Sequence, residues 1–281
     1  MQVFQTGRDR YSPAQGKVFA PVNQRSLAFF VGCVALGLPL ALLFGVYNGV
    51  VPTCFRDSLS HFYYAPFWGS VFIGALIFIG TYLLVYQGED RAGAEGRLAS
   101  WAGLCAYGVG LFPTDGHGCD DGEFLARAMA LFSNEGGVVE IIARLDDSTG
   151  MIDSGLYFQL TRYSQEAHYI SAALLFFFLA WFAFFVFTAV EDHQRNPDGS
   201  LTREKRARNG IYHLCGWIMV AAIAGMAVFG MQRFLGWGDL QYWSDRNLIF
   251  WLESLALWAF GLSWMVKGRF LNSALRDRAE R

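Results

Sequence analysis

The stretch 58–66, which reads Ser-Leu-Ser-His-Phe-Tyr-Tyr-Ala-Pro, holds hydroxyls, an imidazole and phenols between two long apolar segments. Asp115, His168 and Glu253 also lie in or beside apolar segments. If those segments cross a membrane, all of these groups fall in one zone near its outer surface. The candidate site residues are therefore Ser60, His61, Asp115, His168 and Glu253.

Imidazole and carboxylate groups suit zinc, and a catalytic zinc activates a bound water to attack an ester or an amide. A zinc site here would take its ligands from His61, Asp115 and His168. No His-x-x-x-His spacing supports this hypothesis, and the alternative is that both histidines are interfacial residues at headgroup level. The cofactor is therefore unknown, and zinc is expected only if the protein is a metal-dependent hydrolase.

Glu253 lies within an apolar segment, where a carboxylate is costly and usually faces the interior of the bundle. It is either functional or a hydrogen-bonded group that locks helices together, and the sequence leaves both interpretations open. Ser60 beside His61 suggests a serine nucleophile. Adjacent residues rarely point at each other, however, and the chain has no Gly-x-Ser-x-Gly turn around Ser60.

The composition indicates a membrane protein. Hydrophobic residues make up 54% of the 281 residues and charged residues only 16%, against about a quarter in soluble domains. Several windows of about 20 residues without charge are long enough to cross a bilayer. We expect an all-α polytopic membrane protein with a six-helix bundle. The expected transmembrane helices are 27–47, 67–86, 98–114, 167–190, 211–231 and 248–266.

The membrane domain, 27–267, is expected between a cytoplasmic N-terminal segment, 1–26, and a basic cytoplasmic tail, 268–281. Its outer loop, 115–166, is long, and apolar periodicity predicts short interfacial helices within it. No basic stripe with interleaved aromatic residues is present, so nucleic acid is not an expected partner. The two predicted interfacial helices are 123–132 and 138–145.

Basic residues set the expected orientation, because cytoplasmic loops are enriched in Lys and Arg. One side of the six-helix arrangement carries 16 of them and the other carries 6, so both termini are expected in the cytoplasm of a bacterial inner membrane. Cys54 and Cys119 then lie outside, where a disulfide is permitted and would tie the first outer loop to the long one. The remaining cysteines, Cys33, Cys105 and Cys215, are expected to be packing residues.

Small residues at helical spacing predict where helices approach each other closely. Helices 67–86, 98–114 and 211–231 all carry such residues on one face. They are Ser70, Gly74 and Thr81 in the first helix, Ala99, Gly103, Ala106 and Gly110 in the second, and Ala221 and Gly225 in the third.

Four pieces of the sequence, 60–66, 108–115, 168–172 and 250–261, together resemble bacterial six-helix membrane proteins of the DUF998 and Frag1/DRAM/Sfk1 type. This resemblance implies a six-helix bundle, with lipid-associated roles known among eukaryotic relatives. A fainter likeness is to the membrane hydrolase superfamily that includes alkaline ceramidases, in which Ser, Asp and three His build a zinc site within seven helices. The chain offers Ser60, His61, Asp115 and His168, but lacks a late His-x-x-x-His pair and a seventh helix.

We expect a non-catalytic integral membrane protein that binds membrane lipids or a membrane-protein partner through its outer face, for example as an accessory subunit of a larger assembly. The alternative is a metal-dependent membrane lipid hydrolase with its site near the outer leaflet. A proton-coupled carrier is a third hypothesis, disfavoured because only Glu253 is clearly ionisable within a helix and a relay normally needs more such groups.

Overall fold

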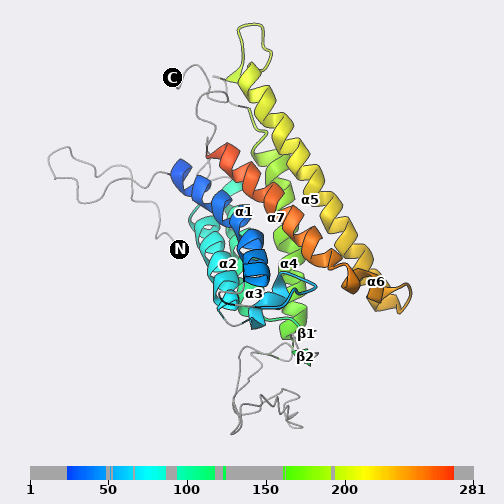
Figure 1. Cartoon of the computed structure of the whole chain (residues 1–281). Helices are drawn as coiled ribbons and strands as arrows, with labels where there is room; N and C mark the ends of the chain where they lie inside the picture. The colour runs from blue at the N-terminus through cyan, green and yellow to red at the C-terminus, as the bar shows by residue number, and fades with distance from the viewer. Residues whose placement is uncertain are drawn as a thin grey trace, which may run out of the picture.

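In the computed structural model, the chain is described over residues 24–48, 51, 53–65, 67–86, 94–117, 123–124, 161, 163–190 and 194–268. Six long helices dominate this part of the chain (Figure 1). They are α1 (Gln24–Asn48), α2 (Trp68–Val85), α3 (Ala94–Leu111), α4 (Ser164–Trp181), α5 (Arg203–Leu235) and α7 (Leu248–Lys267). The short elements are η1 (Ser60–Tyr64), the π-helical turn η2 (Phe182–Val186), α6 (Leu240–Asp245) and the strands β1 (Gly116–His117) and β2 (Glu123–Phe124).

Five of these helices are long and apolar enough to cross a membrane: α1, α2, α4 with η2, α5 and α7. The prediction of a helical protein with several helices that could span a membrane is therefore confirmed. The helix α3 is not among the five, because it begins with Ala-Glu-Gly-Arg and is rich in small residues. A sixth crossing at α3, and the placement of both termini, stay predictions.

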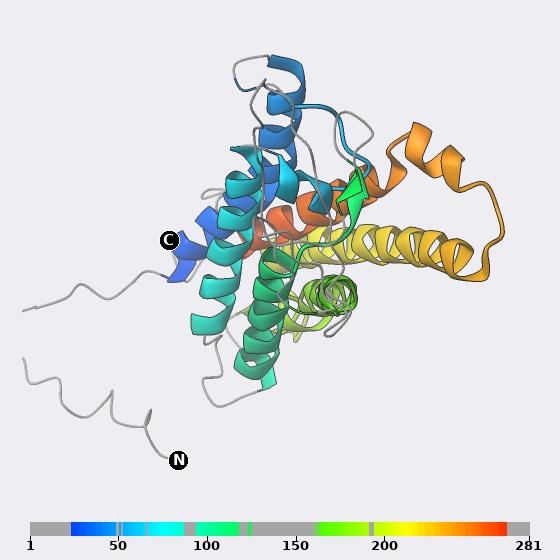
Figure 2. The same ribbon diagram turned by 90° about the horizontal axis from the view of Figure 1, so that it is seen from below.

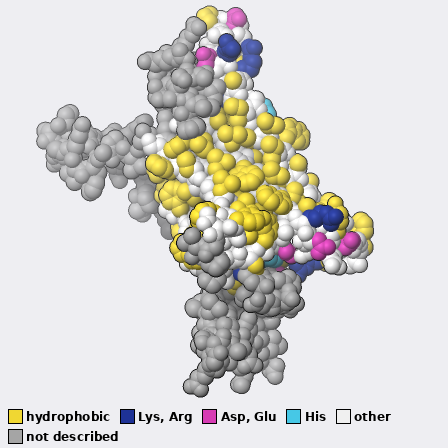
Figure 3. All heavy atoms as spheres, viewed as in Figure 1, with side chains coloured by type: hydrophobic (Ala, Val, Ile, Leu, Met, Phe, Trp, Pro, Cys, Tyr) yellow, Lys and Arg dark blue, Asp and Glu magenta, His cyan; other side chains and the backbone are white. Residues whose placement is uncertain are grey.

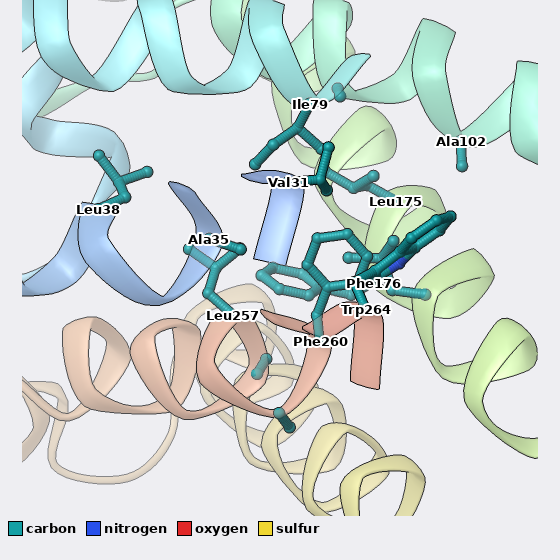
Figure 4. Close-up of a cluster of buried hydrophobic side chains, with 14 of the residues drawn as sticks. Val31, Ala35, Leu38, Ile79, Ala102, Leu175, Phe176, Leu257, Phe260 and Trp264 are labelled. Carbon is teal, nitrogen blue, oxygen red and sulfur yellow. The ribbon is translucent and has the colours of Figure 1, made fainter. Parts of the chain in front are cut away.

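The six long helices close into a ring. Each packs against its neighbours in sequence, and α7 packs against both α5 and α1. The short elements η1 and α6 lie at the connections of this ring, where η1 packs on α2. Figure 4 shows part of the enclosed apolar core, to which Val31 of α1, Ile79 of α2, Leu175 of α4 and Trp264 of α7 contribute.

Glycines set the closest approach in two helix pairs. A Cβ atom on Gly261 of α7 would lie 2.8 Å from the carbonyl oxygen of Gly32 of α1, so the two backbones touch there. In the same way, a Cβ atom on Gly103 of α3 would lie 2.7 Å from the carbonyl oxygen of Gly80 of α2. Small residues let helices pack in this way inside a membrane, where no hydrophobic force draws them together.

The small-residue prediction is right for α3 but wrong at Ser70 and Gly74 of α2. Ala99, Gly103, Ala106 and Gly110 are all buried, as expected. In α2, Ser70 and Gly74 are exposed, and a Cβ atom on Gly74 would meet nothing within 4 Å. Thr81 is also exposed, but its hydroxyl forms a hydrogen bond of 2.7 Å with the Tyr107 hydroxyl of α3. The face of α2 that meets α3 contains Gly80. The sequence did not identify this face, because α2 carries apolar residues on all sides. In α5, Gly225 packs closely on Leu252, as expected, but Ala221 is exposed.

The helix α5 is longer than its predicted apolar segment, 211–231, because its polar first turns are also stabilised. The Thr202 side chain caps it by accepting a hydrogen bond from the Lys205 amide, and Gly236 ends it in the left-handed conformation. With 33 residues it is about 50 Å long at the usual helical rise. Figure 2 shows the end of α5 and α6 standing away from the other helices.

Side chains on the surface form an apolar band with charged groups at its two ends, over the start of α5 and around α6 (Figure 3). This pattern is typical of a protein whose middle lies in lipid. Within the long loop, β1 pairs antiparallel with β2. Residues 123–124 are therefore strand, and the prediction of a helix beginning at residue 123 is wrong there. The rest of 123–132, and all of 138–145, lie outside the described residues.

Candidate functional site

The 3₁₀ turn η1 supplies the centre of the candidate site. The Phe62 amide donates to the Leu59 carbonyl at 3.1 Å and the Ala65 amide to the Phe62 carbonyl at 2.9 Å. Ser60, Phe62 and Tyr64 are buried, and the rings of Phe62 and Phe250 lie 6.1 Å apart. The apolar ring of Phe62 thus anchors the turn against α7, while the polar side chains on either side of it reach other helices.

Glu253 is held by the residues just before η1. The Ser58 Oγ lies 2.8 Å and 3.0 Å from the two carboxyl oxygens of Glu253, and the Leu59 amide donates to one of them at 2.6 Å. The Ser60 amide in turn donates to the Ser58 Oγ at 3.1 Å. The carboxyl group of α7 is therefore engaged by the segment that leads into η1.

Ser60 pairs with His168 of α4. The Ser60 Oγ lies 2.9 Å from His168 Nε2, and His168 Nδ1 lies 2.7 Å from the carbonyl oxygen of Phe112. A carbonyl can only accept, so Nδ1 carries the proton; in the neutral imidazole Nε2 then accepts from the Ser60 hydroxyl. Both side chains are buried, with exposed fractions of 7% for Ser60 and 2% for His168.

Three consecutive carbonyls just beyond α3 each accept a hydrogen bond from another element. Phe112 accepts from His168, Pro113 accepts from Ser164 Oγ at 3.1 Å, and Thr114 accepts from the Tyr64 hydroxyl. Ser164 and His168 are one helical turn apart on α4, so they present their donors side by side. Carbonyls at a helix end lack partners within the helix, and here other elements provide them.

Asp115 belongs to a separate group of contacts. Arg233 of α5 donates to its Oδ2 at 2.9 Å and forms an ion pair, while Tyr169 and Thr114 donate to its Oδ1 at 3.1 Å and 3.0 Å. Burial raises the pKa of Asp115, but the Arg233 hydrogen bond and charge, with the Thr114 and Tyr169 hydroxyls, outweigh burial and lower it below its ordinary value. Asp115 thereby links the end of α3 to α5.

Of the five predicted site residues, the structure brings Ser60 and His168 into direct contact. Glu253 bonds to Ser58 and Leu59, Asp115 pairs with Arg233, and His61 is half-buried between Ser60 and Phe62. Within the described ranges, no group of three His, Cys, Asp or Glu side chains could hold a metal ion. Both ring nitrogens of His168 are already engaged, so the donors present do not form a zinc site in this part of the chain.

Sequence reasoning missed three of the donors. Ser164 donates to the Pro113 carbonyl, and Tyr169 and Arg233 donate to Asp115. The spacing of Ser164 and His168, four residues apart on one helix, is a signal that was present in the sequence. Arg233 carried no such signal, because 118 residues separate it from Asp115.

The cysteines agree with the expectation as far as they are described. Cys54 is disulfide-bonded, as expected for one member of the predicted pair. Cys119 lies outside the described residues, so its pairing with Cys54 stays a prediction. Cys33, Cys105 and Cys215 are free, and the last two are buried in the bundle.

Comparison with known proteins adds no relative. No family model, no curated protein and no solved structure matches the chain. The cluster of hydrogen bonds around η1 is therefore interpreted from its own geometry alone.

Proposed function

We propose that this chain is a non-catalytic integral membrane protein that binds lipid or a membrane-protein partner through its outer face, as an accessory subunit of a larger assembly. The observation that carries the proposal is that the candidate chemical groups bond to one another and to the backbone. Ser58 and Ser60 join η1 to Glu253 of α7 and His168 of α4, and Tyr64 joins it to the chain beyond α3. Such bonds hold helices together.

The surface of α4 supports contact with lipid or a partner. Its large exposed side chains recur at intervals of three or four residues, which places them along one face of the helix. The excess of Lys and Arg on the other side of the bundle supports an orientation in a bacterial inner membrane with both termini cytoplasmic. The exposed face consists of Ile170, Leu174, Phe177, Trp181 and Phe185.

Photo-crosslinking in native membranes tests this proposal. A benzophenone amino acid at Tyr163, exposed at the beginning of α4, is expected to capture one protein of fixed mass, or lipid alone if lipid is the ligand. A matched probe at Tyr212, which is buried in α5, should give neither product. Equal and random protein adducts from both positions would contradict a specific outer partner.

A second candidate function is a serine hydrolase that needs no metal, and one observation favours it. Ser60 lies within hydrogen-bond distance of a histidine that the Phe112 carbonyl orients, which is the arrangement of an activated nucleophile. The Ser60 oxygen would attack the carbonyl carbon of a lipid ester, and His168 would take the proton and pass it to the leaving alcohol. Water would then release the acyl group.

A fluorophosphonate probe separates the two functions. If Ser60 is a nucleophile, the purified protein in detergent will be labelled, and the Ser60→Ala variant will not. Ser70→Ala is the matched control, because Ser70 is exposed at the beginning of α2 and should leave labelling unchanged. If the folded protein is not labelled, the hydrolase hypothesis is wrong. If labelling depends on Ser60, the non-catalytic proposal is wrong.

A further inference from the structure

A second polar feature lies in the aromatic part of the core, apart from the cluster around η1. Trp264 of α7 is fully buried at its centre, with an exposed fraction of 0%. Its ring centroid lies 5.2 Å from Tyr82 and 5.1 Å from Tyr86 of the α2 segment, and 5.9 Å from Phe260. Phe182 and Phe187 lie against it at 6.2 Å and 5.1 Å.

The π-helical turn η2 explains how α4 supplies two of these rings. In a regular α-helix, residues five apart are separated by about 140° around the axis. The wider π turn, closed by the hydrogen bond from the Phe187 amide to the Phe182 carbonyl at 2.9 Å, brings them toward the same side. π-helical turns are rare and often accompany functional sites.

Two donors in this aromatic group have no hydrogen-bond partner among the described residues. They are the Tyr82 hydroxyl and Trp264 Nε1, and their side chains are nine-tenths or more buried. A buried donor without an acceptor has lost the hydrogen bond to water that it makes in the unfolded chain, which destabilises the fold. In a bundle surrounded by lipid, this cost is not relieved by contact with bulk water.

The polar groups nearby do not relieve these donors. The Tyr86 hydroxyl donates to Glu95 at 2.8 Å, and the Ser263 hydroxyl donates to the Ala259 carbonyl at 2.9 Å. The Lys205 ammonium donates to the Phe187 carbonyl at 3.1 Å. The Tyr86 and Ser263 hydroxyls and the Lys205 ammonium thus have acceptors, whereas the Tyr82 hydroxyl and Trp264 Nε1 have none among the described residues.

We infer that Tyr82 and Trp264 form a binding site for an acceptor oxygen. An indole N–H can only donate, so the occupant must bring lone pairs, as a water or a carbonyl oxygen does. Water is the smallest such occupant, and the surrounding rings of Phe182, Phe187 and Phe260 are all buried near Trp264. A buried water makes bonds of this kind to otherwise unsatisfied groups, and the carbonyl of a bound lipophilic molecule would use the same donors.

The Tyr82→Phe variant tests the site with the smallest change, because it removes only the hydroxyl. If an oxygen is bound there, the midpoint of thermal unfolding in detergent should fall by about 2–6 °C. Tyr47→Phe is the matched control, because Tyr47 is 76% exposed and its variant should unfold like wild type. If the Tyr82 hydroxyl has no partner, Tyr82→Phe will be as stable as wild type or more so, which overturns the inference.

The indole N–H of Trp264 gives the second measurement and identifies the source of the oxygen. In protein labelled with ¹⁵N-tryptophan, its signal can be assigned by its loss in Trp264→Phe. Magnetisation transfer from water to this signal is expected for a bound water. A co-purified lipophilic compound seen by native mass spectrometry, and absent from Tyr82→Phe, indicates a carbonyl instead. An indole N–H with neither contact overturns the inference.

Discussion

The Ser60 hydroxyl and the His168 imidazole lie 2.9 Å apart, although 108 residues separate them in the chain. Their hydrogen bond joins the turn before α2 to α4 across the interior of the bundle. Because His168 also donates to the Phe112 carbonyl, one imidazole fixes the positions of three segments. Ser60→Ala should lower the free energy of unfolding by about 1 kcal/mol, since buried hydrogen bonds inside membrane proteins contribute modestly.

The free energy of unfolding of Ser60→Ala can be measured by reversible unfolding in mixed micelles. Ser70→Ala is the control, because Ser70 is exposed. His168→Ala should cost more than Ser60→Ala, because it leaves both the Ser60 hydroxyl and the Phe112 carbonyl without this partner. Equal stability of wild type and His168→Ala would contradict the bridging role of this histidine.

Glu253 should stabilise the bundle through its two neighbours. Glu253→Leu leaves the Ser58 hydroxyl and the Leu59 amide without their acceptor, so the free energy of unfolding should fall by about 2–4 kcal/mol. Glu253→Gln keeps a carbonyl oxygen that accepts from the Leu59 amide, and it should be closer to wild type. The same unfolding assay measures both variants, and a Leu variant as stable as the Gln variant would argue against these hydrogen bonds.

The ion pair of Asp115 with Arg233 should make the stability of the protein depend on pH under acidic conditions. Its native pKa lies below the ordinary value of 3.8, so the unfolded chain takes up the proton first as the pH falls. The stabilisation from Arg233 is therefore fully present above pH 3.8 and is lost as the pH falls through the native pKa. Unfolding midpoints of wild type and Asp115→Asn should differ at neutral pH and converge below this range.

Salt gives the control for this ion pair. The side chains of Arg233 and Asp115 are 51% and 30% exposed, so the difference between wild type and Asp115→Asn should also shrink at high ionic strength. A difference that persists unchanged at acid pH would mean that Asp115 acts through packing and not through its charge.

The glycine contact between α1 and α7 should not tolerate a larger residue. A Cβ atom on Gly261 would lie 2.8 Å from the backbone oxygen of Gly32, so Gly261→Ala should force the helices apart and cost about 1–3 kcal/mol. Gly74→Ala is the matched control in another apolar helix, because its Cβ atom meets nothing within 4 Å. It should be neutral or slightly stabilising, since Ala favours the helix over Gly. Equal effects of the two changes would contradict the close crossing.

Apolar segments in the sequence predicted the long helices well, because length and lack of charge are properties of each segment alone. The start of α5 was missed by eight residues, since a cap at Thr202 and burial of Lys205 stabilise a turn that looks polar. The crossing at Gly80 was missed because a helix that is apolar all round gives no sign of its inner face. Periodicity could separate the faces of α3, where large and small residues alternate at helical spacing.

The sequence identified several residues of the candidate site but not the hydrogen bonds between them. Ser60 and His168 were both named as site residues, but the hydrogen bond between them was not predicted. Phe112, Pro113 and Thr114 act through backbone carbonyls, which every residue has, so no side-chain type identifies them. The pairing of Asp115 with Arg233 depends on where the end of α5 lies relative to the segment beyond α3, which only the assembled bundle determines.

The closure of the ring by α7 has a consequence for how the protein is made. All of the helices that α7 contacts come before it in the chain, and the acceptor for Ser58 and Leu59 is on α7. Until α7 enters the membrane, the donors at Ser58 and Leu59 and the glycine face of α1 lack their partners. Assembly is therefore completed by its latest helix, and a chain halted before residue 248 would present an open seam between α1 and α5.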